Sequence, residues 1–538
     1  MDSPRTTTFP ALWAQSVAAR GEADFLHFED AAGATTVWSY AAFDEVVART
    51  AARFVAGGVS PERGVHLALT NSPAFVATWI AATRLGSWIV PSDPMGTARE
   101  LAEHLERTRP AVGVCAASRA DVYRAAVAAS GVDLAVVEID EADADPAPLL
   151  GDRALTEWPE VPPRARAAVM FTSGTTGRPK GVEITSANYA FAGESMAAAS
   201  ALGAGDRYLV VLPLFHANAQ YYSFAAAIAV GASVALMHTF SASRFVEQAA
   251  RHGATHASLF AGPIRMILAR GGPLAPGFEP ALTLRHCWYA QNITAEQYDT
   301  ISAWLGCRPR QLYGMTETIP AVLTDDADAP RHDAMGWVTP GCVVELQADD
   351  GGPIAAGEVG EVVVGGEPGI TLFAGYLDDA DTTAASFRGG WFLTGDRARL
   401  GTDGRFEFDG RRKDVLKVAG ENVSVVEVEA VIDSHPGVHD VVVVGAPDPV
   451  RDEVPVAFVV PTADAPATLA ADLAAWCAAR LGKAKRPHQI AIVDELPRTS
   501  VGKVRKFMLV DSAARMLELS PTVAPDPRTP PQPEEAPT

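Results

Sequence analysis

A segment rich in hydroxyl groups and glycine, with one lysine, is the first part of this sequence that could carry chemistry. Residues 172–181 read TSGTTGRPKG, and they directly follow AAVM at residues 167–170, a typical buried strand. Glycine amides in a tight turn, with Ser and Thr hydroxyls beside them, can surround an anion. The spacing is not the G-x-x-x-x-G-K-[ST] of P-loop NTPases, so a generic phosphate-cleaving NTPase is the weakest interpretation. We predict a polyphosphate-binding loop rather than a flexible surface turn.

Lysine is scarce in this chain, and its positions are informative. Lys180, inside the loop, is the only lysine before Lys413, although the chain has 44 Lys and Arg residues in total. A flexible ammonium can reach a single oxygen in a way that a planar guanidinium cannot reproduce. The other lysines lie in or beside motif-like segments as well, at Lys413, Lys417, Lys483, Lys485, Lys503 and Lys506. Chance alone fits this distribution poorly.

Four further motifs follow the loop. They are QLYGMTET at residues 311–318, WFLTGD at 391–396, DGRRKDVLKVAGEN at 409–422 and LPRTSVGKVRK at 496–506. Alone, each has an ordinary interpretation, since a Tyr-Gly pair is usually a turn and a basic run is usually a solvated face. Together and in this order they closely resemble the adenylate-forming superfamily of acyl-CoA synthetases, peptide-synthetase adenylation domains and beetle luciferases. The resemblance runs from the region of Pro10 to that of Val510.

The resemblance implies a two-step reaction with ATP, Mg²⁺ and coenzyme A. A small-molecule carboxylic acid attacks the α-phosphorus of ATP to give an acyl-adenylate and pyrophosphate, and the CoA thiol then displaces AMP. Two anions meet in the first step, so preorganised cations and a metal are its main stabilisers. The acceptor could instead be a carrier protein or another nucleophile. A third alternative is an enzyme that only converts a supplied acyl-adenylate to a thioester.

By the family pattern, the site residues take separate roles. Lys180 and the loop hydroxyls cover the β- and γ-phosphates, Thr316 bonds the α-phosphate, and Glu317 is the magnesium ligand. Tyr313 stacks on adenine, and Asp396 accepts the ribose hydroxyls. The implied catalytic residues are Lys503, Thr316, Glu317 and His216, and the implied nucleotide- and cofactor-binding residues are Thr172, Ser173, Gly174, Thr175, Thr176, Lys180, Asn292, Tyr313, Gly314, Asp396, Arg411, Lys417 and Gly420.

The same pattern implies a mobile C-terminal domain. In the family this domain rotates between the half-reactions about a residue that corresponds to Lys413. One face delivers Lys503, which bridges the carboxylate and the α-phosphate, and the other delivers the loop from Lys417 to Gly420, which opens a pantetheine tunnel. Lys485 and its basic neighbours could meet a nucleotide phosphate of CoA, although an interdomain or solvent role fits them equally well.

The sequence departs from the common pattern at residues 288–293. Relatives often have a GGAPL-like turn there, whereas this chain reads WYAQNI, and Tyr289 in place of glycine is expected to narrow the cleft. This form, with PLFHANAQ at residues 213–220, resembles ligases for crotonobetaine and carnitine. His216 is expected at the acyl-pocket entrance. Because buried amides seek partners, Asn218 and Gln220 favour a small or functionalised acid over a long-chain fatty acid.

Composition narrows the remaining possibilities. A formal charge of -21 disfavours nucleic acid and anionic membranes as partners. Five scattered cysteines argue against a disulfide framework or a zinc site and fit a reducing cytoplasm, and no signal peptide is recognisable at the N-terminus. The uncharged stretch from Tyr208 to Ser243 is interrupted by polar residues and proline, so we expect a buried helix and then a strand from Ala232 to Met237, not a membrane span. A homodimer is left open.

The helices and strands that position these motifs are predicted to form an α/β fold. With 538 residues the chain is too long for a single hydrophobic core. Helical patterns at Tyr40–Ala56 and Ser72–Leu85 alternate with strand patterns at Gly64–Leu69 and Ser87–Pro91, which predicts βαβ units and largely parallel sheets. We expect a large N-terminal adenylation domain at residues 1–410, with a small β-barrel-like subdomain at 335–408. A small, mobile α+β domain at 411–517 and a disordered Pro-rich tail at 518–538 complete the chain.

Overall fold

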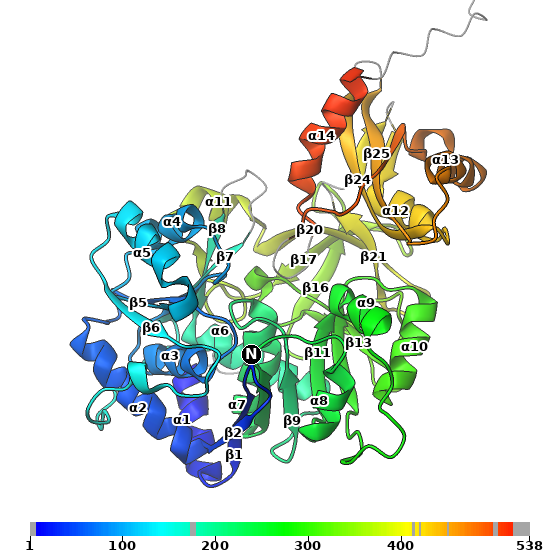
Figure 1. The fold of residues 1–538 in the computed structure, drawn as a ribbon. Helices are drawn as coiled ribbons and strands as arrows, with labels where there is room; N and C mark the ends of the chain where they lie inside the picture. Colours follow the sequence, from blue (N-terminus) through cyan, green and yellow to red (C-terminus); the bar gives the residue numbers. More distant parts are fainter. Residues whose placement is uncertain are drawn as a thin grey trace, which may run out of the picture. The chain divides into compact units, whose positions relative to one another are not determined.

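The computed structural model describes residues 7–172, 179–411, 415–418, 421–448, 451–498 and 504–519. The chain forms two compact units, Met1–Asp409 and Gly410–Thr538. The first unit contains three sheets, and the second contains one (Figure 1).

The largest sheet has nine strands in the order β15-β14-β13-β12-β11-β9-β10-β1-β2. The strands are β1 (Asp24–Glu29), β2 (Thr35–Ser39), β9 (Arg207–Val210), β10 (Ser233–Met237), β11 (His256–Phe260), β12 (His286–Ala290), β13 (Arg310–Tyr313), β14 (Leu323–Thr324) and β15 (Trp337–Val338). The central strands from β13 to β1 pair in parallel, and antiparallel strands close both edges. This confirms the prediction of largely parallel pairing.

A second sheet of seven strands has the order β18-β8-β7-β4-β3-β5-β6. Its strands are β3 (Val65–Ala68), β4 (Ile89–Pro91), β5 (Val112–Ala116), β6 (Ala135–Ile139), β7 (Arg166–Thr172), β8 (Lys180–Thr185) and β18 (Gly375–Tyr376). Strands β7, β4, β3, β5 and β6 are parallel, while β8 and β18 run antiparallel at one edge. The edge therefore joins residues 180–185 to residues 375–376, which are far apart in sequence.

Helices cover both sheets (Figure 1). They are α1 (Phe9–Arg20), α2 (Tyr40–Ala56), α3 (Pro73–Arg84), α4 (Ala98–Thr108), α5 (Ala120–Ser130), α6 (Ser186–Ser200), α7 (Ala225–Val230), α8 (Phe245–Arg251), α9 (Ala261–Arg270) and α10 (Ala295–Leu305). Helix α2 has the predicted bounds, because Ser39 caps its first turn and Gly57 follows its last residue. Helix α3 is buried almost all round, as expected for a helix that is apolar on every side.

The uncharged stretch folds inside the first unit as expected. The π-helix η3 (Asn218–Phe224) leads into α7, and β10 follows. Almost all of these residues are buried, which confirms the predicted helix and strand. Among the described residues, no helix combines the length and the apolar character that a membrane crossing requires.

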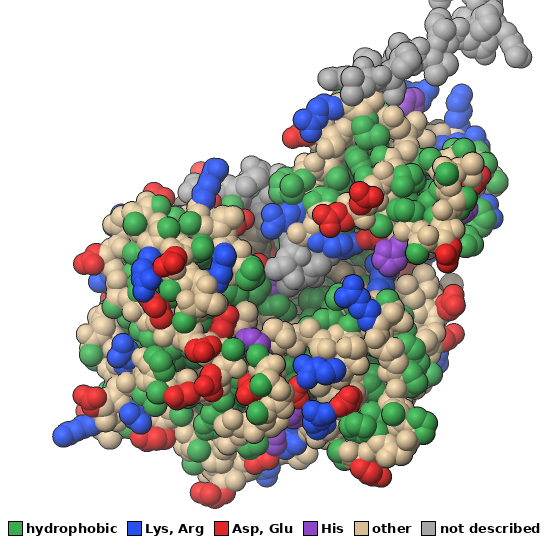
Figure 2. Space-filling model, viewed as in Figure 1, with side chains coloured by type: hydrophobic (Ala, Val, Ile, Leu, Met, Phe, Trp, Pro, Cys, Tyr) green, Lys and Arg blue, Asp and Glu red, His purple; other side chains and the backbone are tan. Residues whose placement is uncertain are grey.

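The third sheet is antiparallel and orders its strands β16-β17-β20-β19, with β21 beside β20. The bounds are β16 (Val343–Gln347), β17 (Gly360–Gly365), β19 (Phe387–Arg388), β20 (Trp391–Leu400) and β21 (Phe406–Arg411), and the short helix α11 (Ala380–Ala385) precedes β19. These are the short β runs expected between residues 335 and 408. Acidic and basic side chains are interspersed over the visible face of the first unit (Figure 2).

The second unit has an α+β fold. Its sheet orders β23-β22-β25-β24, with β26 parallel to β25. The elements are β22 (Val415–Val418), β23 (Glu421–Ser424), α12 (Val425–Asp433), β24 (Val438–Asp448), β25 (Asp452–Pro461), α13 (Leu469–Arg480), β26 (Gln489–Ile492) and α14 (Lys506–Leu519). Lys485 pairs with Glu427 at 2.6 Å, and Arg486 donates to the carbonyl oxygens of Ala478 and Leu481. These two cations therefore have partners within their own unit.

Candidate functional site

Several predicted site residues follow the carboxyl ends of neighbouring parallel strands. Strand β9 precedes His216, β12 precedes Asn292, and β13 ends at Tyr313 and leads to Thr316 and Glu317. Strands β9, β11, β12 and β13 are adjacent and parallel. Because such carboxyl ends meet at one edge, where ligands of α/β sheets usually bind, the fold brings these residues to the same side of the sheet.

The base of the predicted phosphate loop is a strand pair. Thr172 at the end of β7 lies opposite Lys180 at the start of β8. The predicted roles of Ser173, Gly174, Thr175 and Thr176 concern positions outside the described residues, so they stay predictions. The structure defines the two ends of the loop, at Thr172 of β7 and Lys180 of β8.

Helix α4 contacts the chain both before and after the predicted phosphate loop. The ring of His104 stacks on Phe171 with centroids 3.9 Å apart and planes 4° from parallel. The guanidinium carbon of Arg107 lies 4.9 Å from the centre of the Phe171 ring, and its Nη1 donates to the carbonyl oxygen of Pro179 at 2.6 Å. Phe171 and Pro179 flank residues 173–178, so one helix holds the chain on both sides of them.

A buried hydrogen-bond chain supports His104 from behind. Ser92 Oγ lies 2.8 Å from His104 Nδ1 and 3.0 Å from His66 Nε2, and His66 Nδ1 lies 2.9 Å from the hydroxyl of Tyr123. Burial, aided by the charge of Arg107, lowers the pKa of His104 to about 4. The ring is therefore neutral near pH 7, and it supports Phe171 by stacking rather than by its charge.

Tyr376 connects the loop lysine to the predicted metal ligand. The Lys180 ammonium lies 4.5 Å from the centre of the Tyr376 ring, a cation–π distance. The Tyr376 hydroxyl donates to Glu317 Oε1 at 3.1 Å. Burial, and then the negative charge of Glu317, raise the pKa of Tyr376. One side chain thus touches both a cation and a carboxylate that are 137 positions apart in sequence (317 − 180).

The backbone around Glu317 is held by a hydrogen bond and includes an unusual conformation. Glu317 lies in the short 3₁₀ helix η4 (Thr316–Thr318), and its carbonyl oxygen accepts from Phe373 N at 3.0 Å. The next turn places Ile319, a β-branched residue, at φ 73° and ψ -83°. Strained backbone of this kind concentrates at functional sites. A Cβ on Gly314 would lie 2.9 Å from the Cα of Ala321, a backbone clash that favours glycine at that position.

Tyr313 and Asp396 are in direct contact. The Tyr313 hydroxyl donates to Asp396 Oδ2 at 2.7 Å, and the aspartate is 3% exposed. Gly395 precedes it in the left-handed region at φ 72°, which aims the aspartate side chain of β20 toward β13. Tyr313 and Glu317 lie on one short segment, so the Lys180–Tyr376–Glu317 chain and the Tyr313–Asp396 pair are parts of the same region.

A cavity of about 220 Å³ opens beside β12 and β13. It is lined by Asn292, Ile293, Gln311, His332, Asp333, Ala334, Met335 and Phe408. Asn292 was among the predicted binding residues, whereas Lys180, Glu317 and Asp396 do not line this cavity. Tyr289 does not line it either. The structure buries its ring completely and points its hydroxyl at the carbonyl oxygen of His332, 3.3 Å away.

The polar residues near His216 have structural partners. Gln220 Nε2 donates to the carbonyl oxygen of Leu214 at 2.6 Å, and the Tyr189 hydroxyl bonds to Gln220 Oε1. Asn218 Oδ1 accepts from Ser258 Oγ at 2.9 Å. The amide of Gln220 therefore holds the segment before His216 in place. The polar character of Gln220, one of the two residues that were expected to favour a functionalised acid, thus has a structural explanation that needs no substrate.

Some predicted residues belong to the second unit or lie outside the described chain. Arg411 lies beyond the division at Asp409, and Lys417 is part of β22. Gly420 and Lys503 are outside the described residues, so their roles stay predictions. Within the described part, no group of three His, Cys, Asp or Glu side chains could hold a metal ion. A single carboxylate such as Glu317 still fits Mg²⁺, which commonly takes one or two protein carboxylates plus phosphate oxygens.

Sequence reasoning missed Tyr376, although it is the residue that joins Lys180 to Glu317. The only local signal was its place after Gly375 in a short β run of residues 375–377. It also missed Gln311, which lines the cavity two residues before Tyr313, and the wall of the cavity at residues 332–335.

Comparison with known protein families gives two matches. The family described as "AMP-binding enzyme" matches residues 13–377. The family described as "AMP-binding enzyme C-terminal domain" matches residues 427–503. A crotonobetaine/carnitine–CoA ligase of Salmonella typhimurium is 32% identical over 506 residues, which is 92% of this chain and 97% of that protein.

Solved structures share this architecture. An anthranilate CoA ligase in complex with anthranoyl-AMP superposes with a TM-score of 0.85 at 22% identity, covering 96% of this chain and 99% of that one. ATP-bound MatB from Rhodopseudomonas palustris superposes with a TM-score of 0.84 at 25% identity, covering 95% of this chain and all (100%) of that one.

Proposed function

The chain belongs to the AMP-binding enzyme family, and from this premise we propose that it is an ATP-dependent, AMP-forming acid–CoA ligase. The observation that carries the proposal is the contact chain from Lys180 through Tyr376 to Glu317, beside the bonded pair of Tyr313 and Asp396. A cation, a magnesium-type carboxylate, an aromatic ring and a second carboxylate are the groups that a nucleoside triphosphate needs.

In the proposed first step, a carboxylate oxygen of the acid attacks the α-phosphorus, and the bond from this phosphorus to the oxygen bridging to the β-phosphate breaks. Pyrophosphate leaves with that electron pair. Lys180 is proposed to bind the departing phosphates and Lys503 to bring the two anions together. Glu317 would hold Mg²⁺, which would neutralise charge on the phosphate oxygens. Charge grows on phosphate oxygens during this step, so fixed cations lower the barrier.

In the proposed second step, the thiol sulfur of CoA attacks the acyl carbon. The acyl–oxygen bond to AMP breaks, AMP leaves with the electron pair, and the thiol proton passes to solvent. Arg411 is proposed to contact the ribose beside Asp396. Lys417 and Gly420 are proposed to take part through the C-terminal domain, residues 411–517, which we propose to rotate between the steps. Rotation of this kind often limits turnover.

The proposed substrates and the free cysteines indicate the cellular compartment of the enzyme. ATP and CoA are cytoplasmic substrates, and all five cysteines are free thiols, which suits a reducing compartment. Mg²⁺ is the proposed metal and a small or functionalised carboxylic acid the proposed substrate.

Acid-dependent exchange of pyrophosphate into ATP tests the first step, with a panel of carboxylic acids and AMP release as a second readout. Including CoA or a phosphopantetheinylated carrier protein identifies the acceptor. Exchange with an acid followed by an acyl-CoA product supports the proposal. Thioester formation only from a supplied acyl-adenylate, without exchange for any acid, would contradict it and favour the transferase alternative.

A further inference from the structure

One wall of the cavity beside β12 and β13 is a loop without regular secondary structure. Residues 325–336 connect β14 to β15, and four of them, 332–335, line the cavity. A loop of this length normally moves unless its polar groups are held. The contacts that hold this one are therefore relevant to the shape of the cavity.

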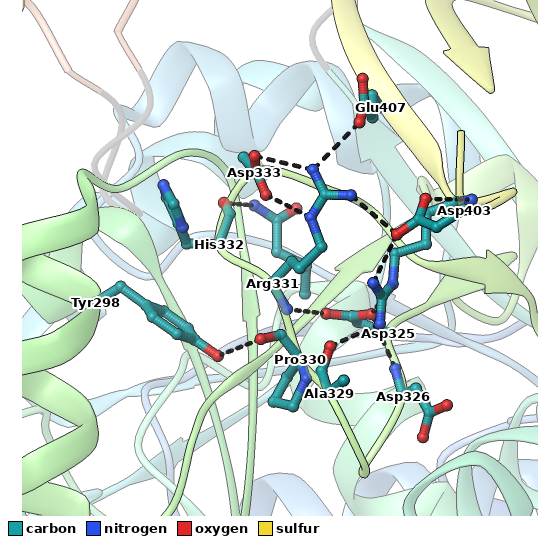
Figure 3. A network of polar contacts seen from close by, with 12 residues as sticks. Tyr298, Asp325, Asp326, Ala329, Pro330, Arg331, His332, Asp333, Asp403 and Glu407 are labelled. Atoms are coloured by element: carbon teal, nitrogen blue, oxygen red, sulfur yellow. Dashed lines mark hydrogen bonds and ion pairs between the residues drawn. The ribbon is translucent and has the colours of Figure 1, made fainter. Parts of the chain in front are cut away.

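Arg331 is the centre of these contacts. Its Nε and Nη2 donate to Oδ1 and Oδ2 of Asp333 at 2.9 and 3.0 Å, a two-point pairing that fixes the carboxylate plane. Nη1 donates to Asp403 Oδ2 at 2.9 Å, and Nη2 also donates to Glu407 Oε1 at 3.2 Å. Figure 3 shows the Arg331 guanidinium among these three carboxylates.

The partners of Arg331 come from two sides of the cavity. Asp333 itself lines the cavity within the loop, and Glu407 immediately precedes Phe408, which lines the cavity from β21. The hydrogen bond of Arg331 lowers the pKa of Asp333, so that carboxylate is ionised near pH 7. One guanidinium thus connects the loop wall to the strand wall.

Further contacts hold the loop backbone. The Asp325 carboxylate accepts from Arg331 N at 2.7 Å and from Arg405 Nε at 3.2 Å. Gln311 Nε2 donates to the carbonyl oxygen of His332 at 3.0 Å, alongside the Tyr289 hydroxyl. The loop is therefore fixed at its start and at His332. At its end, Met335 N donates to the carbonyl oxygen of Phe406 and Phe406 N donates to that of Gly336, both at 2.8 Å, so Arg331 adds a side-chain attachment to β21 beside these backbone bonds.

We propose that Arg331 is a positioning residue for the nucleobase, because it holds the two walls of the cavity at a fixed separation through Asp333 and Glu407. This inference rests on the proposed function, since it assigns the cavity beside Tyr313 to the base of ATP or AMP. A wall that is already in place when the nucleotide arrives removes an ordering cost from binding. The phosphate-binding groups are separate and do not depend on it.

The test measures the affinities of the full-length protein for AMP and for inorganic pyrophosphate by titration calorimetry. Arg331→Gln should weaken AMP binding about fivefold, the upper range for one exposed charged contact, and leave pyrophosphate binding unchanged. Arg331→Lys should weaken AMP binding about twofold, because an ammonium keeps the charge but loses the fork geometry. Arg251→Gln is the matched control, since Arg251 has an exposed ion pair on α8 with Glu247.

A double-mutant cycle separates positioning from general stability. If Arg331 acts through Asp333, Arg331→Gln should add little to the AMP affinity loss of Asp333→Asn. Additive losses, or equal loss of AMP and pyrophosphate binding, would overturn the inference, as would unchanged AMP binding in Arg331→Gln. A wild-type protein that neither binds AMP nor shows acid-dependent exchange would instead refute the proposed function, so the two failures are distinguishable.

Discussion

Removing the hydroxyl of Tyr376 is the most direct test of the arrangement around Glu317. The change Tyr376→Phe keeps the aromatic ring that faces Lys180 at 4.5 Å and deletes only the donor that bonds Glu317 Oε1 at 3.1 Å. Because Glu317 is 7% exposed, little water can replace the lost donor. A hydrogen bond to a charged group contributes about 1.5–3 kcal/mol, and each ~1.4 kcal/mol is tenfold, so the lower end corresponds to roughly tenfold.

The assay is acid-dependent pyrophosphate exchange measured across Mg²⁺ concentrations at saturating ATP. Tyr376→Phe should raise the Mg²⁺ concentration for half-maximal exchange about tenfold, as expected for loss of a partner that orients a metal ligand. Tyr40→Phe is a matched control, since that buried hydroxyl donates to the carbonyl oxygen of Ala232 at 2.7 Å. If Glu317→Gln changes the Mg²⁺ dependence and Tyr376→Phe does not, Tyr376 has no part in orienting the carboxylate.

Three further predictions concern other parts of the chain. Arg107→Met should raise the KM for ATP several-fold with kcat nearly unchanged, because it releases Pro179 from α4, and an unchanged KM would contradict this. Lys503→Ala should abolish exchange yet spare thioester formation from a supplied acyl-adenylate, whereas equal loss in both assays would contradict a two-face C-terminal domain. Burial lowers the pKa of His256 to about 4 from an ordinary 6.5, so the unfolded chain binds the extra proton between these values. The stability that His256 contributes should be complete above pH 6.5 and fall toward pH 4 by up to about 1.4 kcal/mol per pH unit. His256→Gln should therefore reduce the slope in urea unfolding by about that amount, while buried His104 keeps its own contribution.

Elements with strong local patterns were predicted well from the sequence. The helix Tyr40–Ala56 has its capping serine and terminal glycine in the sequence itself, and the buried stretch from Tyr208 could be separated from a membrane span by its polar interruptions. The parallel pairing followed from alternation of helices and strands. The place of β1 beside β10 could not be inferred, because strands far apart in sequence pair through the tertiary fold.

The site was predicted unevenly for the same reason. Motif order singled out Lys180, Glu317, Tyr313 and Asp396, whose nucleotide-binding roles stay predictions, but it did not single out Tyr376, which bonds to a residue 59 positions away. Tyr289 was expected to narrow a cleft because a larger side chain replaces glycine in relatives. Which way a strand residue points depends on register and packing, and here β12 aligns Tyr289 with Gln311 and sends both side chains toward the carbonyl oxygen of His332.

The scarcity of lysine makes Lys180 a built-in chemical reporter. No other lysine lies between Met1 and Arg412, so an acyl or alkyl tag on a side-chain amine within that stretch identifies a single nitrogen atom. That nitrogen faces the ring of Tyr376, in the region proposed to hold the phosphates. Mass mapping of amine-reactive labelling, with and without nucleotide, would therefore read occupancy at one atom without any engineered probe.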